Sequence, residues 1–377
     1  MPYGIAFEFL DVGMGDCTLI QMPPWDRGEI VLVDFGQKGS TFTVAVEDAT
    51  KFLVERISLI CRNRNLGFPL IDHLFITHGD ADHWNKLGDL IDGVAGNDRD
   101  LWHVLGKWPP GTKLTINRLT FGGNWQTDYK NKNFIVAQKI ESAMINVNNV
   151  TTLADRDHDI NNPRWASNGT NIILLSSNYP NKIGGDINNK SLVLMFEYNG
   201  YKVILPGDAG VDVEAEILRN YPANFLKSFG LKLGHHGSAG STSAQWVDAV
   251  QPHVIFASGD RRWGHPYCAS IKRVMDKGSL ATTVERRWFA CTCPGNDNDY
   301  RSISTNLTIC NNLWYAVTHP AGEMRFGPDG KQYLGPYGLY TGVQWRLQID
   351  GGVDPVLTHT DQWPVPDPNI TPAFCPP

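Results

Sequence analysis

Residues 77–84 carry the most informative stretch of the chain, Thr77-His78-Gly79-Asp80-Ala81-Asp82-His83-Trp84. An apolar run that we predict as a buried strand, residues 71–77, leads into it, and a predicted helix over residues 83–91 follows. Four side chains with metal-binding groups fall within six positions: His78, Asp80, Asp82 and His83. Helix capping would account for one aspartate, but not for two aspartates flanked by two histidines. Because imidazole and carboxylate groups bind Zn²⁺, Mn²⁺ or Fe²⁺, the loop predicts a metal site.

Strands and helices alternate outward from this loop. On its N-terminal side we predict strands over residues 4–10, 17–22 and 29–34 and a helix over 42–62. On its C-terminal side, residues 96–183 are less regular, with a strand at 113–121 and a helix at 133–144. Strands at 191–198, 201–205, 228–233 and 254–258 follow, with helices at 213–221, 243–250 and 270–277 between and after them. Such alternation in two successive halves predicts an α/β sandwich with helices outside two sheets.

The composition changes after about residue 285. Gly, Pro, Asn, Thr and aromatic residues become frequent, and short strands are expected at 306–309, 313–318 and 343–349. We therefore expect a catalytic domain over residues 1–285 and a strand-rich extension over residues 286–377 that packs on it.

Charge and cysteine content restrict the class of protein. The net charge of −6 excludes a global basic field, so any contact with nucleic acid must be local. The densest basic stretch offers such a surface through Arg261, Arg262, Lys272 and Arg273. The seven cysteines lack a regular framework, which is typical of reduced thiols. No stretch approaches the roughly 18 apolar residues of a membrane helix, so we expect a cytoplasmic protein that does not span a membrane.

The loop also carries a resemblance. His-x-Asp-x-Asp-His is similar to the metal motif of the metallo-β-lactamase superfamily, in the variant found in the hydrolase-like domain of the bacterial competence DNA-uptake channel family. Further blocks match that family in order, at residues 9–16, 31–36, 188–194, 205–209, 231–238 and 264–266. The resemblance implies a four-layer αββα sandwich, a metal-dependent hydrolase, and a carboxylate, that of Asp34, beneath the site.

Family positions then imply individual roles. The metal ligands would be His78, Asp80, Asp82, His83, Asp208 and His235, with Asp208 shared between two ions. Asp82, His236 and His265 would take part in catalysis, with His236 behind the ligands or acting as a proton donor. His265 has several open roles: it could protonate a leaving group, contact a phosphate, replace His235 as the last ligand, or be structural.

One departure from the family pattern affects the metal. Most members of the superfamily have a histidine where this chain has Asn188, Asn189 and Ser191. Without that ligand, and with Asp80 in place of a histidine, the first site is richer in oxygen. This favours manganese beside zinc and leaves open whether one or two divalent ions bind.

Three functions fit the sequence. The first is a phosphodiesterase that acts on nucleic acid, since two metal ions suit displacement at phosphorus. The second is hydrolysis of a small ester, amide, lactone or cyclic nucleotide, because function lies in the loops rather than the scaffold. The third is an effector subunit whose site is silent until a protein partner activates it.

Overall fold

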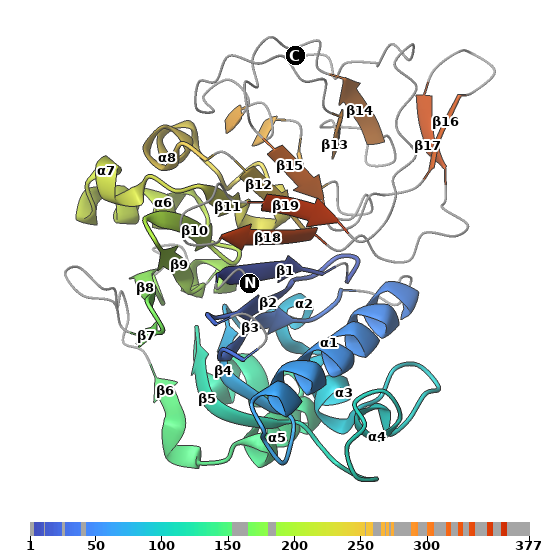
Figure 1. The fold of residues 1–377 in the computed structure, drawn as a ribbon. Coiled ribbons are helices and arrows are strands. Elements are labelled where there is room, and N and C mark those ends of the chain that lie inside the picture. The colour runs from blue at the N-terminus through green and yellow to red at the C-terminus, as the bar shows by residue number, and fades with distance from the viewer. Residues whose placement is uncertain are drawn as a thin grey trace.

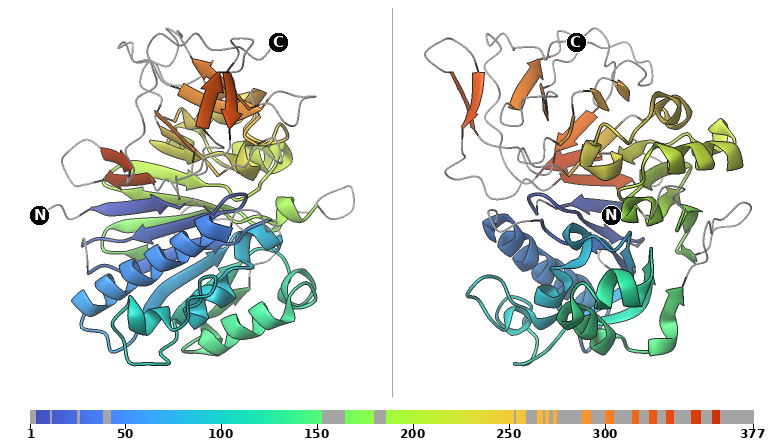
Figure 2. Two further views of the ribbon diagram at one scale, coloured as in Figure 1. Left: turned by 90° about the vertical axis from the view of Figure 1, so that its right-hand side faces the viewer. Right: turned by 180° about the vertical axis from the view of Figure 1, so that it is seen from behind.

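Two β-sheets face each other, and helices cover their outer faces (Figures 1 and 2). The computed structural model describes residues 4–10, 12–24, 27–38, 43–152, 165–179, 186–252, 254–258, 265–267, 269–270, 273–274, 288–292, 300–304, 314–317, 323–326, 332–335, 345–349 and 356–359. The predicted four-layer αββα sandwich is confirmed.

The first sheet holds eight strands in the described part of the chain, in the order β19-β18-β1-β2-β3-β4-β5-β6. Strands β3 to β6 are parallel neighbours, whereas β18, β1, β2 and β3 pair antiparallel. Strands β3 and β4 are buried along their whole length, as is usual for the central strands of a parallel sheet, whereas β5 is partly exposed. Their bounds are β1 Ile5–Phe9, β2 Cys17–Gln21, β3 Ile30–Phe35, β4 Leu70–Ile76, β5 Thr115–Phe121, β6 Val150–Thr152, β18 Trp345–Ile349 and β19 Val356–His359.

The second sheet has the order β15-β12-β11-β10-β9-β8-β7 among the described strands. Strands β9 and β10 form the predicted hairpin, and both turn residues, Asn199 and Gly200, have positive φ, as tight hairpin turns require. The bounds are β7 Trp165–Ser167, β8 Thr170–Ser176, β9 Val193–Tyr198, β10 Tyr201–Leu205, β11 Gly230–Lys232, β12 Val254–Ala257 and β15 Trp314–Val317. Two separate hairpins pair β13 Trp288–Thr292 with β14 Tyr300–Ser304, and β16 Glu323–Phe326 with β17 Gln332–Gly335.

Helices on the two outer faces complete the four layers (Figure 1). The first sheet is covered by α1 Thr43–Asn63, α2 Ala81–Trp84, α3 Leu87–Asp92, α4 Leu101–Val104 and α5 Phe134–Ala143. The second sheet is covered by α6 Val211–Asn220, α7 Ala223–Leu226 and α8 Ala244–Val250. Irregular turns lie at Trp125–Lys130, Val147–Asn149, Ile187–Lys190 and Gly234–Gly237.

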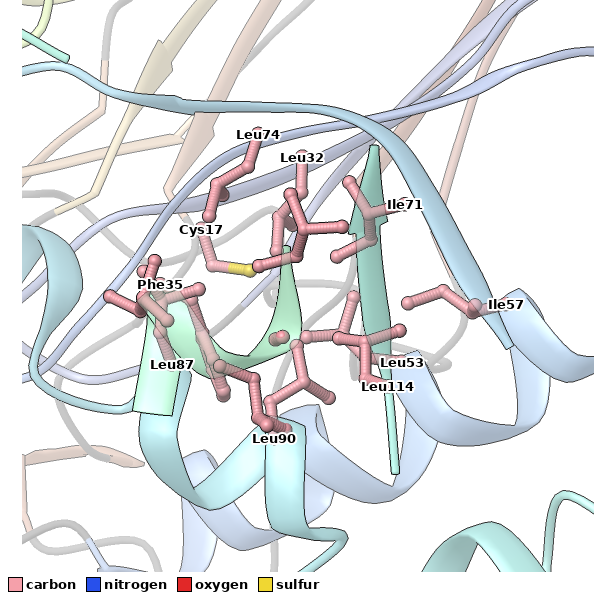
Figure 3. Packing of buried hydrophobic residues seen from close by; sticks show 14 of the residues in the cluster. Cys17, Leu32, Phe35, Leu53, Ile57, Ile71, Leu74, Leu87, Leu90 and Leu114 are labelled. Atoms are coloured by element: carbon pink, nitrogen blue, oxygen red, sulfur yellow. The ribbon is translucent and has the colours of Figure 1, made fainter. Parts of the chain in front are cut away.

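Three apolar layers hold the sandwich together. One lies between the first sheet and its helices, where side chains of α1 and α3 pack on the strands (Figure 3). A second lies between the other sheet and helices α6 and α8. The third fills the space between the sheets, where Phe9 of β1 stacks on Phe256 of β12 with ring centroids 3.7 Å apart.

The helix predicted over residues 83–91 is divided into α2 and α3. The residues between them are held by the loop after β3. Asn85 donates to the carbonyl of Gln37 and accepts from its N–H, at 2.7 and 2.9 Å. The N–H of Lys86 donates to the carbonyl of Phe35 at 3.1 Å. Tertiary hydrogen bonds therefore replace the helical ones at this point.

Strand β8 was not among the predicted strands, although it lies inside the second sheet. Its Asn-Ile-Ile-Leu-Leu run is buried on both faces, and such a run has no alternating pattern that distinguishes a strand. The strand predicted at residues 306–309 and most of the helix predicted at 270–277 lie outside the described residues.

The division at residues 285 and 286 remains a prediction. Three strands from beyond it extend the two sheets: β15 pairs with β12, β18 pairs with β1, and β19 pairs with β18.

The layer between the sheets provides a test of the fold. We expect Phe256→Ala to lower the free energy of unfolding by about 3–5 kcal/mol, because it leaves a cavity against Phe9. Phe134→Ala is the matched control, since Phe134 is 59% exposed, and its effect should stay within about 0.5 kcal/mol. Denaturant unfolding measures both. Equal effects would contradict the assignment of Phe256 to the core between the sheets.

Candidate metal centre

The predicted ligands lie at the ends of strands from both sheets. The loop of residues 77–84 follows β4, and Asp208 follows β10. Asp34 is the second-to-last residue of β3. His235 and His236 follow β11, in the short turn Gly234–Gly237. Because these strand ends share one edge of the sandwich, residues far apart in the sequence meet there.

Two histidines from different sheets face the same carboxylate. His83 Nε2 is 3.3 Å from Asp208 Oδ1, and His236 Nε2 is 3.5 Å from Asp208 Oδ2. His236 Nε2 is also 3.6 Å from Asp82 Oδ2. Two atoms that each bind one ion at about 2.0–2.2 Å lie roughly 3–3.5 Å apart. These side chains therefore have the spacing of a shared cation site.

Two further histidines lie near Asp208. His78 Nε2 is 3.9 Å from Asp208 Oδ2 and 3.9 Å from Asp80 Oδ2. His235 Nε2 is 3.7 Å from the same Asp208 oxygen, and its side chain is 32% exposed. Four histidine nitrogens thus surround the carboxylate of Asp208.

Unpartnered polar atoms test whether this cluster fits a metal. Four buried atoms within this cluster have no hydrogen-bond partner: His78 Nε2, His83 Nε2, Asp208 Oδ1 and His236 Nε2. Buried polar atoms are otherwise almost always paired, because desolvation without a partner is costly. All four belong to residues that form compact groups of possible ligands. The cluster therefore fits a divalent metal ion.

Hydrogen bonds behind His83 fix its orientation. His83 Nδ1–H donates to Asp34 Oδ2 at 2.8 Å, so its Nε2 faces Asp208. Asp34 is held in turn by the N–H and the hydroxyl of Thr77, both at 2.7 Å. A carboxylate behind a histidine is the usual support of a metal ligand. The carboxylate that the family resemblance implied beneath the site thus contacts His83.

The buried carboxylates of the cluster favour the binding of a cation. Burial lowers the pKa of His236, but the carboxylates of Asp208 and Asp16 outweigh burial and raise it to about 9. Burial raises the pKa of Asp208, yet His236 and His83 hold it well below its usual range. Burial and the neighbouring His83 lower the pKa of His78 to about 3. The ionised Asp208 thus favours protons on His236 and His83, whose pKa values are both raised, and a metal ion would displace these protons.

The two adjacent histidines differ from the predicted arrangement. His236, expected behind the ligands, is fully buried inside the cluster, whereas His235, expected as the last ligand, lies at its rim. Both adopt positive φ, 47° and 54°, so the backbone turns sharply and both rings reach Asp208. Sequence spacing could not decide between them, because this left-handed turn is not visible in it.

His265 lies beside these two rings, with centroids 5.6 Å from His235 and 6.1 Å from His236. Burial and then His236 lower the pKa of His265 to about 3. A neutral imidazole suits metal or phosphate binding better than proton donation at neutral pH.

Ser191 is one of the three residues that stand where the family resemblance implies a histidine. Ser191 is buried, and its hydroxyl accepts a hydrogen bond from the N–H of Asp208 at 3.0 Å. The chain therefore uses this position to hold the loop that carries Asp208.

Asp16 and Lys232 are buried polar residues near the site that sequence reasoning missed. Asp16 Oδ2 lies 3.6 Å from His83 Nδ1 and 2.5 Å from Lys232 Nζ. The sequence does contain one indication of this pair. Lys232 interrupts an apolar strand, and a buried lysine requires a partner.

The predicted basic surface is not supported. Arg273 donates from its guanidinium to the carbonyls of Ser241, Thr242 and Ala239 at 2.8–2.9 Å, so its hydrogen bonds are used to hold a loop. Arg261, Arg262 and Lys272 lie outside the described residues.

Fold and cluster together define a hydrolase-type α/β sandwich with a candidate divalent metal site. Three known proteins are similar to the chain in sequence. ComE operon protein 3 of Bacillus subtilis is 25% identical over 263 residues, 69% of this chain and 29% of that protein. Competence protein ComA of Neisseria gonorrhoeae is 33% identical over 117 residues, 30% and 16% of the two chains. Recombination protein 2 of Haemophilus influenzae is 23% identical over 269 residues, 71% and 26%.

By name, these relatives include a competence protein and a recombination protein, and the resemblance predicted from the sequence is confirmed. The chain spans less than a third of the length of each. No family model matches it. The crystal structure of unliganded yeast PDE1 matches 62% of this chain and 75% of its own, with 12% identity and a TM-score of 0.32, too weak a likeness to support an argument.

The predicted cytoplasmic location is wrong, because the relatives are DNA-uptake proteins of the membrane. Across the described residues, the helices are too short or too polar to cross a membrane.

The support behind His83 generates a prediction. We expect Asp34→Asn to lower the affinity for Mn²⁺ or Zn²⁺ by about 10–100-fold, because an amide supports the His83 ring less well than a carboxylate. Titration calorimetry of the purified chain measures the affinity. Asp72→Asn is the control, since Asp72 is also buried in the first sheet but pairs with Arg64. Unchanged affinity in Asp34→Asn would contradict this role.

Proposed function

We propose that the chain is a metal-dependent phosphodiesterase that acts on nucleic acid. The observation that carries this proposal is the position of Asp208, whose two carboxylate oxygens face the buried and unpartnered Nε2 atoms of His78, His83 and His236. One ion would be held by His78 and Asp80, with His235 at the rim. The other would be held by Asp82, His83 and His236. This arrangement suits two divalent ions that share Asp208.

When bound, the ions would supply a Lewis acid for the phosphoryl oxygen and a hydroxide nucleophile at neutral pH. The residues of the chain hold the reacting groups in place. Asp34 and Thr77 keep His83 directed at Asp208, and Ser191 holds the backbone of Asp208. His235 and His265 lie at the open side, where a substrate phosphate would contact them.

The donor atoms favour Mn²⁺ as well as Zn²⁺. The carboxylates of Asp80 and Asp208 lie near His78 Nε2, and His83 and His235 also face Asp208. Oxygen-rich sites suit manganese, whereas sites with several histidines suit zinc.

Positive charge beside the cluster supports an anionic substrate. Lys38 Nζ lies 4.0 Å from Asp82 Oδ2, and Lys132 Nζ lies 3.2 Å from Asp80 Oδ1. Both side chains are more than 40% exposed, so they can also reach a phosphate. The relatives, which are competence and recombination proteins by name, support DNA as the source of that phosphate.

Metal-dependent turnover is the test of this function. The chain, stripped with EDTA and reloaded with Mn²⁺ or Zn²⁺, should hydrolyse single- or double-stranded DNA, RNA or bis-p-nitrophenyl phosphate. Asp208→Asn should abolish turnover and most metal binding, because both ligand groups depend on this carboxylate. Turnover of the small diester alone would favour a small-molecule hydrolase. Metal binding without any turnover would favour a subunit that requires a protein partner.

The two lysines generate a separate prediction. We expect Lys38→Gln together with Lys132→Gln to raise KM for a polynucleotide by about 10–100-fold, because each loses a charge-assisted contact with phosphate. Lys113→Gln with Lys139→Gln is the matched control, since both lysines pair with Asp92. Steady-state kinetics at two salt concentrations measure the effect. Equal KM values in the two double variants would contradict a phosphate-binding role.

A further inference from the structure

A buried ion pair lies directly behind His236. Asp16 and Lys232 are 3% and 4% exposed, and Asp16 Oδ2 is 2.5 Å from Lys232 Nζ. The other Asp16 oxygen accepts the hydroxyl hydrogen of Ser258. Ser258 is buried as well, and its Oγ lies 3.0 Å from His236 Nδ1. Lys232, Asp16, Ser258 and His236 thus form one continuous buried chain of polar contacts.

The direction of each hydrogen bond follows from its neighbours. Lys232 can only donate, and the ionised Asp16 can only accept. The Ser258 hydroxyl donates its single hydrogen to Asp16, so its oxygen must accept from His236 Nδ1–H. With the proton fixed on Nδ1, the Nε2 lone pair of neutral His236 is directed toward Asp82 and Asp208. This atom is among the buried atoms without a hydrogen-bond partner.

Burying this series of polar contacts costs free energy. Two charges lose their hydration, and an apolar pair of similar volume would usually fill a core at least as well. The three supporting residues come from distant parts of the sequence, before β2, at the end of β11 and after β12. The backbone of Asp16 also contacts the ligand loop, because its N–H donates to the carbonyl of Asp82 at 3.0 Å. The network therefore connects the ligand loop of one sheet with the histidine turn of the other.

We propose that Asp16, Ser258 and Lys232 are positioning residues that hold the His236 ring in its metal-binding orientation and tautomer. This inference rests on the metal site of the proposed function. His236 would then be supported in the same way as His83, whose Nδ1–H donates directly to the carboxylate of Asp34. Ser258 carries the link to a carboxylate, and Lys232 keeps that carboxylate charged. The left-handed backbone at His235 and His236 is then held from behind by this network.

Ser258→Ala gives the cleanest test, because it removes the hydroxyl that bridges His236 Nδ1 and Asp16 and leaves the ion pair intact. We expect zinc affinity, measured by competition with a chromophoric chelator, to fall about 10–100-fold, the usual effect of losing such support. Ser258→Thr keeps the hydroxyl and should restore it. In zinc-loaded protein, the imidazole ¹⁵N spectrum should show the proton of His236 on Nδ1 in the wild type and a disturbed signal in Ser258→Ala.

Two further variants separate positioning from a structural role. Asp16→Asn with Lys232→Met removes both charges together, so no unpaired charge is left buried. It should lower zinc affinity to a similar extent. Arg64→Met breaks the Asp72–Arg64 pair elsewhere in the first sheet and should lower stability without changing zinc affinity. Denaturant unfolding of the metal-free variants provides the comparison.

The possible outcomes distinguish between the positioning role, the metal centre and the proposed function. Wild-type affinity in Ser258→Ala and in the double variant would overturn the positioning role, even if both unfold more easily. A wild-type chain that binds no divalent ion would overturn the metal centre and this inference with it. Zinc binding with the expected losses, but no hydrolysis of any phosphodiester, would overturn the proposed function and leave the positioning role standing.

Discussion

Buried negative charge at one edge of the sandwich is the constraint on which the site depends. Asp16, Asp34, Asp82 and Asp208 are all nearly inaccessible to solvent. Carboxylates so close together in a medium of low dielectric constant are tolerated only with compensating positive charge. Lys232 compensates Asp16 from within the chain, and His83 compensates Asp34. Asp208 has histidines beside it, and Asp82 has His236 and the partly exposed Lys38, so a divalent cation bound among them would complete the balance.

That balance requires side chains from both sheets, so it depends on the apolar layer between them. His78, Asp82 and His83 follow a strand of the first sheet, while Asp208 and His236 follow strands of the second. The stacked rings of Phe9 and Phe256 belong to the layer that sets the distance between the two groups. Because protein interiors are close-packed, that distance cannot drift without loss of stability. Stability and site geometry thus arise from the same contacts.

Positive charge lies close to the cluster, although the chain as a whole is acidic. A net charge of −6 gives no general attraction for a polyanion. Lys38 and Lys132 nevertheless stand beside the acidic ligands Asp82 and Asp80. Arg273, which the sequence pattern had suggested for a basic surface, instead holds the loop around Ser241. Local placement of charge, not its density along the sequence, thus decides where a phosphate can be bound.

The sequence by itself determined the sandwich and the position of its central loop. Four ligand types within six positions, between an apolar strand and a helix, are a local pattern, and the ordered family blocks located Asp34 and Asp208 as well. Local patterns could not identify β8, because a strand buried on both faces has no alternation to reveal it. They could not rank His235 against His236 either, since a left-handed turn aims the two rings. Only the tertiary structure joined Asp16, Lys232 and Ser258, because such pairing depends on how two sheets pack rather than on neighbours along the chain.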